Sequence, residues 1–189
     1  MIRIGILGDI GSGKSYVAKN FGYPVFNADV EVGKLYQKDR KVFNKLKKVL
    51  PKYIYSFPIN KNEICEAILA NNSNLKKIVS IVHLEIRKKM NIFLKKNINK
   101  KIVIMDIPLL LENKINKKND ILVFVQSTKI DIFKRLKKRK NFSLKIYKKF
   151  KNIQLSLDYK KKKSLFVIKN NFTNMSVKRS IKKILKEIL

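Results

Sequence analysis

The feature that most constrains this chain is a glycine-rich run near its start. Residues 8–15 read Gly-Asp-Ile-Gly-Ser-Gly-Lys-Ser and match the pattern G-x-x-x-x-G-K-[ST] throughout. Glycines allow positive φ angles and close backbone approach, so successive N–H groups can surround a phosphate. The apolar run Ile2–Leu7 precedes the motif and a helical pattern follows it. The sequence therefore predicts a strand, a phosphate-binding loop and a helix N-terminus, in that order.

The polar residues of this loop indicate a nucleoside triphosphate as its ligand. Lys14 is expected to reach the β- and γ-phosphates, and the hydroxyl of Ser15 to hold Mg²⁺. We therefore predict ATP and Mg²⁺ as cofactors. The residues expected to contact the nucleotide are Gly11, Ser12, Gly13, Lys14, Ser15 and Tyr16.

Further apolar runs alternate with helical patterns along the rest of the chain. Strands are predicted at 23–27, 101–106, 121–125 and 165–168, and the continuous runs at 101–106 and 121–125 are typical of parallel strands buried on both faces. Helices are predicted at 60–70, 75–93, 128–139 and 173–189. This alternation predicts an α/β fold with a five-stranded parallel sheet flanked by helices.

Two segments do not fit the alternation and are predicted to be insertions. Residues 29–97 read as a helical insertion between the second and third strands, and the highly charged residues 140–158 read as a small mobile lid. The nucleotide-binding core would then consist of residues 1–28, 98–139 and 159–189. The run of four lysines at 160–163 is expected to be a solvated loop.

Two acidic residues are candidates for catalysis or metal binding. Asp29 lies 15 residues after Lys14, just past the second strand, where a carboxylate can accept the proton of an attacking hydroxyl. Asp106 closes the third strand and is expected to help position Mg²⁺. The alternative for each is helix or turn capping, for which Asp is favoured.

Basic side chains supply the remaining candidates. Arg135 and Arg139 are spaced i, i+4 on a predicted helix and could reach over a transferred phosphate from the lid; the alternative is a solubilising surface. His83 is the only histidine and lies in the long predicted helix, where exposed helix surface is the simpler interpretation. A lone histidine argues against a histidine-based metal site.

The composition leaves two interpretations of the charge open. With 45 Lys plus Arg against 13 Asp plus Glu, the formal charge is +32, which a nucleic-acid-binding protein could show. Only 6 of the 45 are Arg, however, and the charge is spread along the chain, which favours compositional drift over a specific nucleic-acid surface. The single Cys65 excludes an intrachain disulfide and suits a reducing, cytoplasmic compartment. No targeting signal or membrane-spanning segment is expected.

These residues, in this order, resemble the dephospho-CoA kinase family over nearly the whole chain. The matching segments are the loop Ile6–Ser15, Asn27-Ala28-Asp29, His83, Ile107-Pro108-Leu109-Leu110-Leu111-Glu112, Gln154, and Val167-Ile168-Lys169-Asn170. The resemblance implies a P-loop NTPase kinase fold and ATP-dependent phosphorylation of the ribose 3′-hydroxyl of dephospho-CoA. The alternatives are another small-molecule P-loop kinase, acting on a nucleoside or nucleoside monophosphate, or a basic nucleic-acid-binding protein.

The resemblance also implies roles for individual residues. Asp29 would be the catalytic base, Lys14 and Arg139 would act on the transferred phosphoryl group, and Asn170 would contact the nucleotide. Dephospho-CoA would contact Asp29, His83, Pro108 and Leu109 in and near the inserted helices. The protein is expected to be a monomer or weak homo-oligomer with no specific nucleic-acid or membrane partner.

The chain departs from the family pattern at four positions. Asp9 stands where the phosphate loop usually has glycine, Asn27 replaces the first Asp of the D-A-D segment, and Leu84 replaces a proline. Phe150 stands where an arginine usually precedes the lid glutamine by four residues, and a lysine flanks it on either side. Because lysine lacks the bidentate fork of arginine, a weaker clamp on the phosphates is expected.

Overall fold

The computed structural model describes residues 1–139 and 142–189, and these form two compact units. The first unit contains residues 1–27 and 97–189, and the second contains residues 28–96. Each unit is described by itself below. Among the described residues, no helix combines the length and apolar character needed to cross a membrane.

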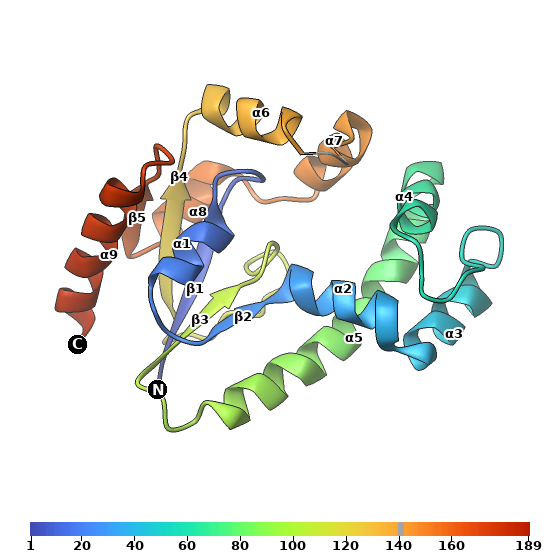
Figure 1. Ribbon diagram of the computed structural model, residues 1–189, viewed down its shortest axis with the longest axis horizontal. Helices are drawn as coiled ribbons and strands as arrows, with labels where there is room; N and C mark the ends of the chain where they lie inside the picture. Colours follow the sequence, from blue (N-terminus) through green and yellow to red (C-terminus); the bar gives the residue numbers. More distant parts are fainter. Residues whose placement is uncertain (140–141) are drawn as a thin grey trace. The chain divides into compact units, whose positions relative to one another are not determined.

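The first unit is built on a five-stranded sheet (Figure 1). Every pairing is parallel and the strand order is β2-β3-β1-β4-β5. The predicted parallel five-stranded α/β fold is therefore confirmed. The strands are β1 (Ile2–Gly8), β2 (Val25–Asn27), β3 (Ile102–Asp106), β4 (Ile121–Gln126) and β5 (Phe166–Lys169).

Helices cover the sheet because its strands are apolar on both faces. All five residues of β3 are buried. Helices α1 (Lys14–Asn20) and α9 (Asn174–Ile188) pack together against the sheet, while α8 (Leu157–Lys163) packs on β1 and β4. Figure 1 shows α1 in front of the sheet and α8 behind it. The core on the α1 and α9 side includes Ile4, Ile6, Val17, Ile104, Val125, Ile168, Val177 and Ile181.

The register of the sheet brings several strand ends to one edge. Asn27 at the end of β2 is opposite Asp106 at the end of β3, and Gly8 at the end of β1 is opposite Val125 in β4. Carboxyl ends of parallel strands form the edge where ligands bind in open α/β sheets. The loop at residues 8–15 begins at this edge.

Two more helices of the first unit follow β4. Helix α6 (Lys129–Lys137) begins after Thr128, whose hydroxyl accepts a hydrogen bond from the Asp131 N–H at 3.1 Å. It ends two residues before Arg139, so the predicted i, i+4 pairing of Arg135 with Arg139 on one helix is wrong. Helix α7 (Leu144–Asn152) is joined to α6 by aromatic contacts: the ring of Phe142 meets that of Phe133 edge to face and that of Tyr147 at a tilt.

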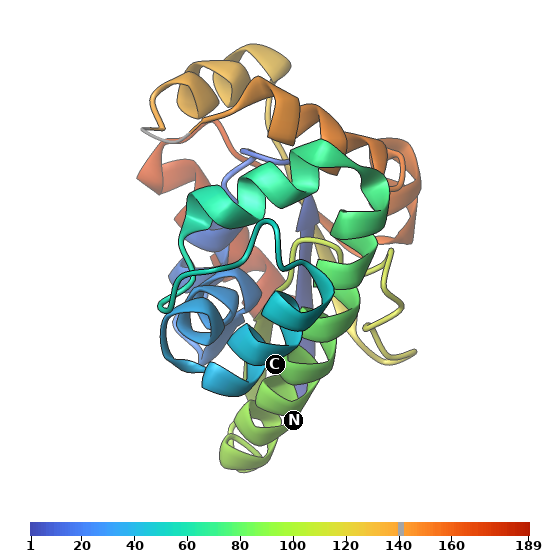
Figure 2. The same ribbon diagram turned by 90° about the vertical axis from the view of Figure 1, so that its right-hand side faces the viewer.

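The second unit consists of four helices: α2 (Ala28–Lys38), α3 (Arg40–Val49), α4 (Lys61–Ala70) and α5 (Asn72–Lys96). The long helix α5 contacts each of the other three, as Figure 2 shows. Its buried residues Leu75, Ile78, Val82 and Ile86 repeat at steps of three and four, which is the stripe that predicted this helix.

The lysine run at 160–163 is not the solvated loop that its charge suggests. It forms the last turn of α8, and Lys160 is 1% exposed. The ammonium of Lys160 lies 2.6 Å from Oε1 of Glu112, which neutralises its charge in the interior. A carboxylate that is distant in sequence, that of Glu112, therefore allows one lysine of the run to be buried.

Candidate active site

The phosphate loop has the backbone conformation that its glycines predicted. Gly8, Gly11 and Gly13 have φ angles of 145°, 87° and 90°, in the region that glycine adopts without strain. A Cβ atom at Gly13 would lie 2.3 Å from Nδ2 of Asn170. Glycine is therefore required at this position both for its backbone angle and for the space beside it.

Side chains from two other strand ends hold the loop in place. Asn170, which is 2% exposed, donates from Nδ2 to the carbonyl of Ser12 at 2.8 Å and accepts from the Phe172 N–H at 2.9 Å. The Ser127 hydroxyl lies 3.0 Å from the carbonyl oxygens of both Ser12 and Asn170. The structure thus shows Asn170 supporting the loop, and it adds Ser127, which sequence reasoning missed.

Lys14 lies folded over its own loop. Its ammonium donates to the carbonyl of Asp9 at 2.8 Å and lies 3.3 Å from the carbonyl of Gly8. The neighbouring Tyr16 is partly exposed, and its hydroxyl donates to Oδ1 of Asn174 at 2.8 Å. Tyr16 therefore links the first turn of α1 to the first turn of α9.

Three polar side chains meet beside the loop. Asn27 donates from Nδ2 to Oδ2 of Asp106 at 2.5 Å, and the same nitrogen lies 3.5 Å from Oγ of Ser15. Asp106 is 3% exposed, and burial raises the pKa of its carboxyl group. Hydrogen bonds from Ser15 and Asn27 and the charge of Lys14 act in the opposite direction, because each stabilises the carboxylate.

The donor set of this cluster fits Mg²⁺. Mg²⁺ prefers hard oxygen ligands and is commonly held by one or two protein groups together with waters and substrate phosphates. A Ser hydroxyl and a buried carboxylate beside a phosphate loop provide such groups. Among the described residues, no group of three or more His, Cys, Asp or Glu forms a metal site of another kind.

Two predicted site residues lie in the second unit. Asp29 is the second residue of α2 and is exposed, so it lies within the helix and is not its N-cap. His83 is half-buried on α5, where burial and, to a smaller extent, the charge of Arg87 lower the pKa of its imidazole. The capping interpretation of Asp29 is therefore not supported by the helix boundary.

The remaining predicted residues belong to connecting segments of the first unit. Pro108 and Leu109 are half-buried in the segment after β3, and Arg139 is exposed after the end of α6. The Arg135 guanidinium lies over the ring of Phe172 at 4.2 Å. Arg135 thus stacks on an aromatic residue just after Asn170.

The predicted lid is partly described. Its first two residues, 140 and 141, lie outside the described residues, and its last two belong to α8. Between them is α7, whose nine described residues include none that is buried. The α7 residue Lys151 forms an ion pair with Asp9 of the phosphate loop, with 2.6 Å between Nζ and Oδ1.

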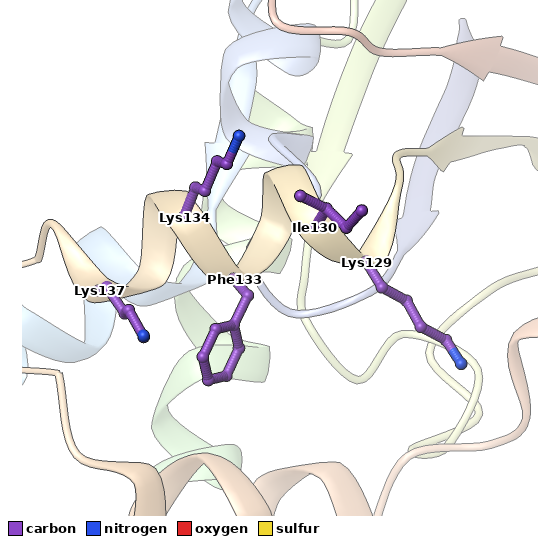
Figure 3. A pocket seen from close by; sticks show the side chains of 5 residues that line it. All are labelled: Lys129, Ile130, Phe133, Lys134 and Lys137. Carbon is purple, nitrogen blue, oxygen red and sulfur yellow. The ribbon is translucent and has the colours of Figure 1, made fainter.

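A shallow groove on α6 is lined by basic and apolar side chains. Figure 3 shows Phe133 with Lys129 and Lys137 on one side of this helix and Lys134 on the other; Ile130 completes the lining. None of these five residues belongs to the phosphate loop or to the cluster around Asp106. The candidate active site is therefore the loop and its neighbouring strand ends.

The chain is similar to known proteins over nearly its whole length. Residues 2–175 match the family model described as dephospho-CoA kinase. A curated dephospho-CoA kinase of Wolbachia pipientis wMel is 32% identical over 186 residues, covering 96% of this chain and 95% of the relative. The crystal structure of TT1252 from Thermus thermophilus superposes with a TM-score of 0.80 at 25% identity, covering 100% of this chain and 98% of that one. Dephospho-CoA kinase from Campylobacter jejuni shares the fold with a TM-score of 0.64 at 21% identity, covering 98% and 96%.

Proposed function

This chain belongs to the dephospho-CoA kinase family, and we propose that it transfers the γ-phosphoryl group of ATP to the ribose 3′-hydroxyl of dephospho-CoA. The products are CoA and ADP. The observation that carries the proposal is the complete phosphate loop, supported by Ser127 and Asn170, in a chain that matches the family model over residues 2–175.

The phosphate loop and Lys14 bind the triphosphate in this proposal. The loop N–H groups and the N-terminus of α1 attract its negative oxygens, and Lys14 leaves its own loop carbonyls for the β- and γ-phosphates. Ser15 and Asp106 would hold Mg²⁺, which neutralises charge on the β- and γ-phosphates when bound. Asn27 orients the Asp106 carboxylate for this task by donating to Oδ2.

Asp29 is the proposed catalytic base. It follows the end of β2 by two residues, close in sequence to the Asn27 that contacts Asp106. Its carboxylate would accept the proton of the 3′-hydroxyl as that oxygen attacks the γ-phosphorus, the new O–P bond forms and the bond to ADP breaks. Its exposure in the first turn of α2 leaves it accessible to a substrate.

The substrate and lid assignments follow the same proposal. Residues 29–97 and the segment after β3 would bind dephospho-CoA, with contacts from His83, Pro108 and Leu109. Residues 140–158 would close over the phosphates, excluding water, and Arg139 would stabilise the charge of the moving phosphoryl group. We expect the enzyme to act in the cytoplasm, where the free Cys65 stays reduced, as a monomer or weak homo-oligomer.

The decisive experiment measures phosphoryl transfer from Mg-ATP to dephospho-CoA by the purified protein. Lys14→Ala serves as the blank, and a panel of nucleosides and nucleoside monophosphates tests other acceptors. Transfer to dephospho-CoA by the wild type alone would support the proposal. Preference for a nucleoside monophosphate would establish a different small-molecule kinase.

A second experiment tests the base. Asp29→Asn keeps the size of the side chain and removes its ability to accept a proton, so kcat should fall by about 10²–10⁴-fold. The equilibrium affinity for ATP should stay within about twofold, because the phosphate loop is unchanged. Turnover equal to that of the wild type would remove Asp29 from this role.

A further inference from the structure

Helix α7 reaches the phosphate loop through the ion pair of Lys151 with Asp9. The Nζ–Oδ1 distance is 2.6 Å, and the side chains are 35% and 10% exposed. The same Oδ1 accepts a hydrogen bond from the Ile10 N–H at 2.7 Å. The loop backbone thus fixes the direction of the Asp9 carboxylate, and the carboxylate in turn fixes the position of the Lys151 ammonium.

Asp9 brings two ammonium groups to the same part of the loop. Lys14 donates to the backbone carbonyl of Asp9 at 2.8 Å, while Lys151 contacts its side chain. An ammonium group has three N–H donors, so the bond to Oδ1 leaves donors of Lys151 available to another acceptor. One carboxylate against two ammonium groups and the loop N–H groups leaves the site positive, which suits a phosphate.

We propose that Asp9 positions Lys151 as a second phosphate-contacting lysine of the nucleotide site. The proposal rests on the proposed function and names a residue pair at that site. It joins an acid of the phosphate loop, Asp9, to a lysine of α7, Lys151, in one arrangement. The acid in the loop holds a cation whose side chain lacks the fork of arginine.

Equilibrium titration with a non-hydrolysable ATP analogue and Mg²⁺ tests the contact. Lys151→Ala should weaken binding about tenfold or more, since hydrogen bonds to charged groups are the strong ones. Lys151→Arg should retain most of the affinity. Lys148→Ala is the matched control, because Lys148 is an exposed lysine of the same helix. If Lys151→Ala weakens binding no more than Lys148→Ala does, the proposal is overturned.

Asp9→Asn tests the positioning role, because it keeps the acceptor for the Ile10 N–H and removes the charge. In the wild-type background it should weaken binding of the analogue, since Lys151 loses its anchor. In the Lys151→Ala background it should leave binding unchanged or tighten it, since the carboxylate then only repels phosphate. An equal effect in both backgrounds would refute positioning. Tighter binding in the wild-type background would also refute it, and would show that Asp9 holds Lys151 away from the nucleotide.

The binding readout separates this inference from the proposed function. It requires no transfer to dephospho-CoA, so a protein that phosphorylates a different acceptor would still show the coupling of Asp9 with Lys151. Conversely, transfer to dephospho-CoA without that coupling would support the function and refute the inference. Thermal melting of each variant excludes unfolding as the cause of lost affinity.

Discussion

Glu112 and Lys160 form an ion pair in the interior of the first unit, and its removal should be costly. The pair joins the segment after β3 to α8, with side chains 9% and 1% exposed. Oε1 of Glu112 also accepts a hydrogen bond from the Leu155 N–H at 3.0 Å. Glu112→Gln keeps an acceptor of similar size for Leu155 and leaves the Lys160 ammonium buried without a counter-charge.

The expected loss follows from the depth of the pair. Removing one partner of a buried ion pair costs about 3–5 kcal/mol, a large part of the roughly 5–15 kcal/mol that stabilises a domain. At about 2 kcal/mol per molar urea, the unfolding midpoint should fall by about 2 M. Lys160→Met combined with Glu112→Gln should recover most of this loss, because Met fills the space without charge.

Urea unfolding followed by far-ultraviolet circular dichroism measures these midpoints. Glu187→Gln is the control, because Glu187 is an exposed carboxylate on α9. If Glu112→Gln shifts the unfolding midpoint no more than Glu187→Gln does, the Lys160 ammonium does not need the Glu112 carboxylate as a buried counter-charge, and the reasoning is refuted. If the double variant is less stable than Glu112→Gln, the penalty does not come from an uncompensated ammonium.

The backbone conformation of two glycines and the pKa of Asp106 give further predictions. Gly13→Ala should lower the free energy of unfolding by about 2 kcal/mol or more and weaken ATP binding, because its φ is 90° and its Cβ would displace the Asn170 amide. Gly33→Ala, with nothing within 4 Å of the added Cβ and a helical position in α2, should instead stabilise by about 0.5–1 kcal/mol. The raised pKa of Asp106 should move the acidic limb of the Mg²⁺-dependent rate above the pH expected for an ordinary Asp, since only the carboxylate binds the ion. The stability of the ligand-free protein should change with pH in the opposite direction from the rate. The Asp106 carboxyl group stabilises the fold below its unfolded-state pKa, and this contribution is lost as pH rises through its folded-state pKa. Asp106→Asn should remove both pH effects.

The sheet could be predicted because its signals are local. Buried parallel strands such as β3 and β4 consist of continuous apolar residues, and the phosphate loop carries its glycines within eight residues. The stripe on α5 likewise repeats within one helix. Each of these elements depends on neighbours in sequence, so the sequence alone identifies them.

Contacts between distant residues were not predictable in the same way. Lys160 reads as one of four solvated lysines, and its burial is explained by its ion pair with Glu112, far earlier in the chain. The pairing of Asp9 with Lys151 spans 142 positions, and nothing in either segment indicates the other. Ser127 supports the loop from 115 positions away and has no motif of its own. These contacts depend on how segments that are far apart in the chain meet in the fold.

The hydrogen bond from Asn170 to the Ser12 carbonyl has a consequence for how the protein is made. Its two residues are 158 positions apart, so a ribosome completes the whole glycine motif long before the side chain that supports it exists. Domains fold as units during synthesis, and contacts of long sequence separation close late. A nascent chain halted between residues 127 and 170 would carry every residue of the motif and the Ser127 hydroxyl, and lack the Asn170 amide that also holds the Ser12 carbonyl. The loop therefore gains its full support only after residue 170 has been synthesised.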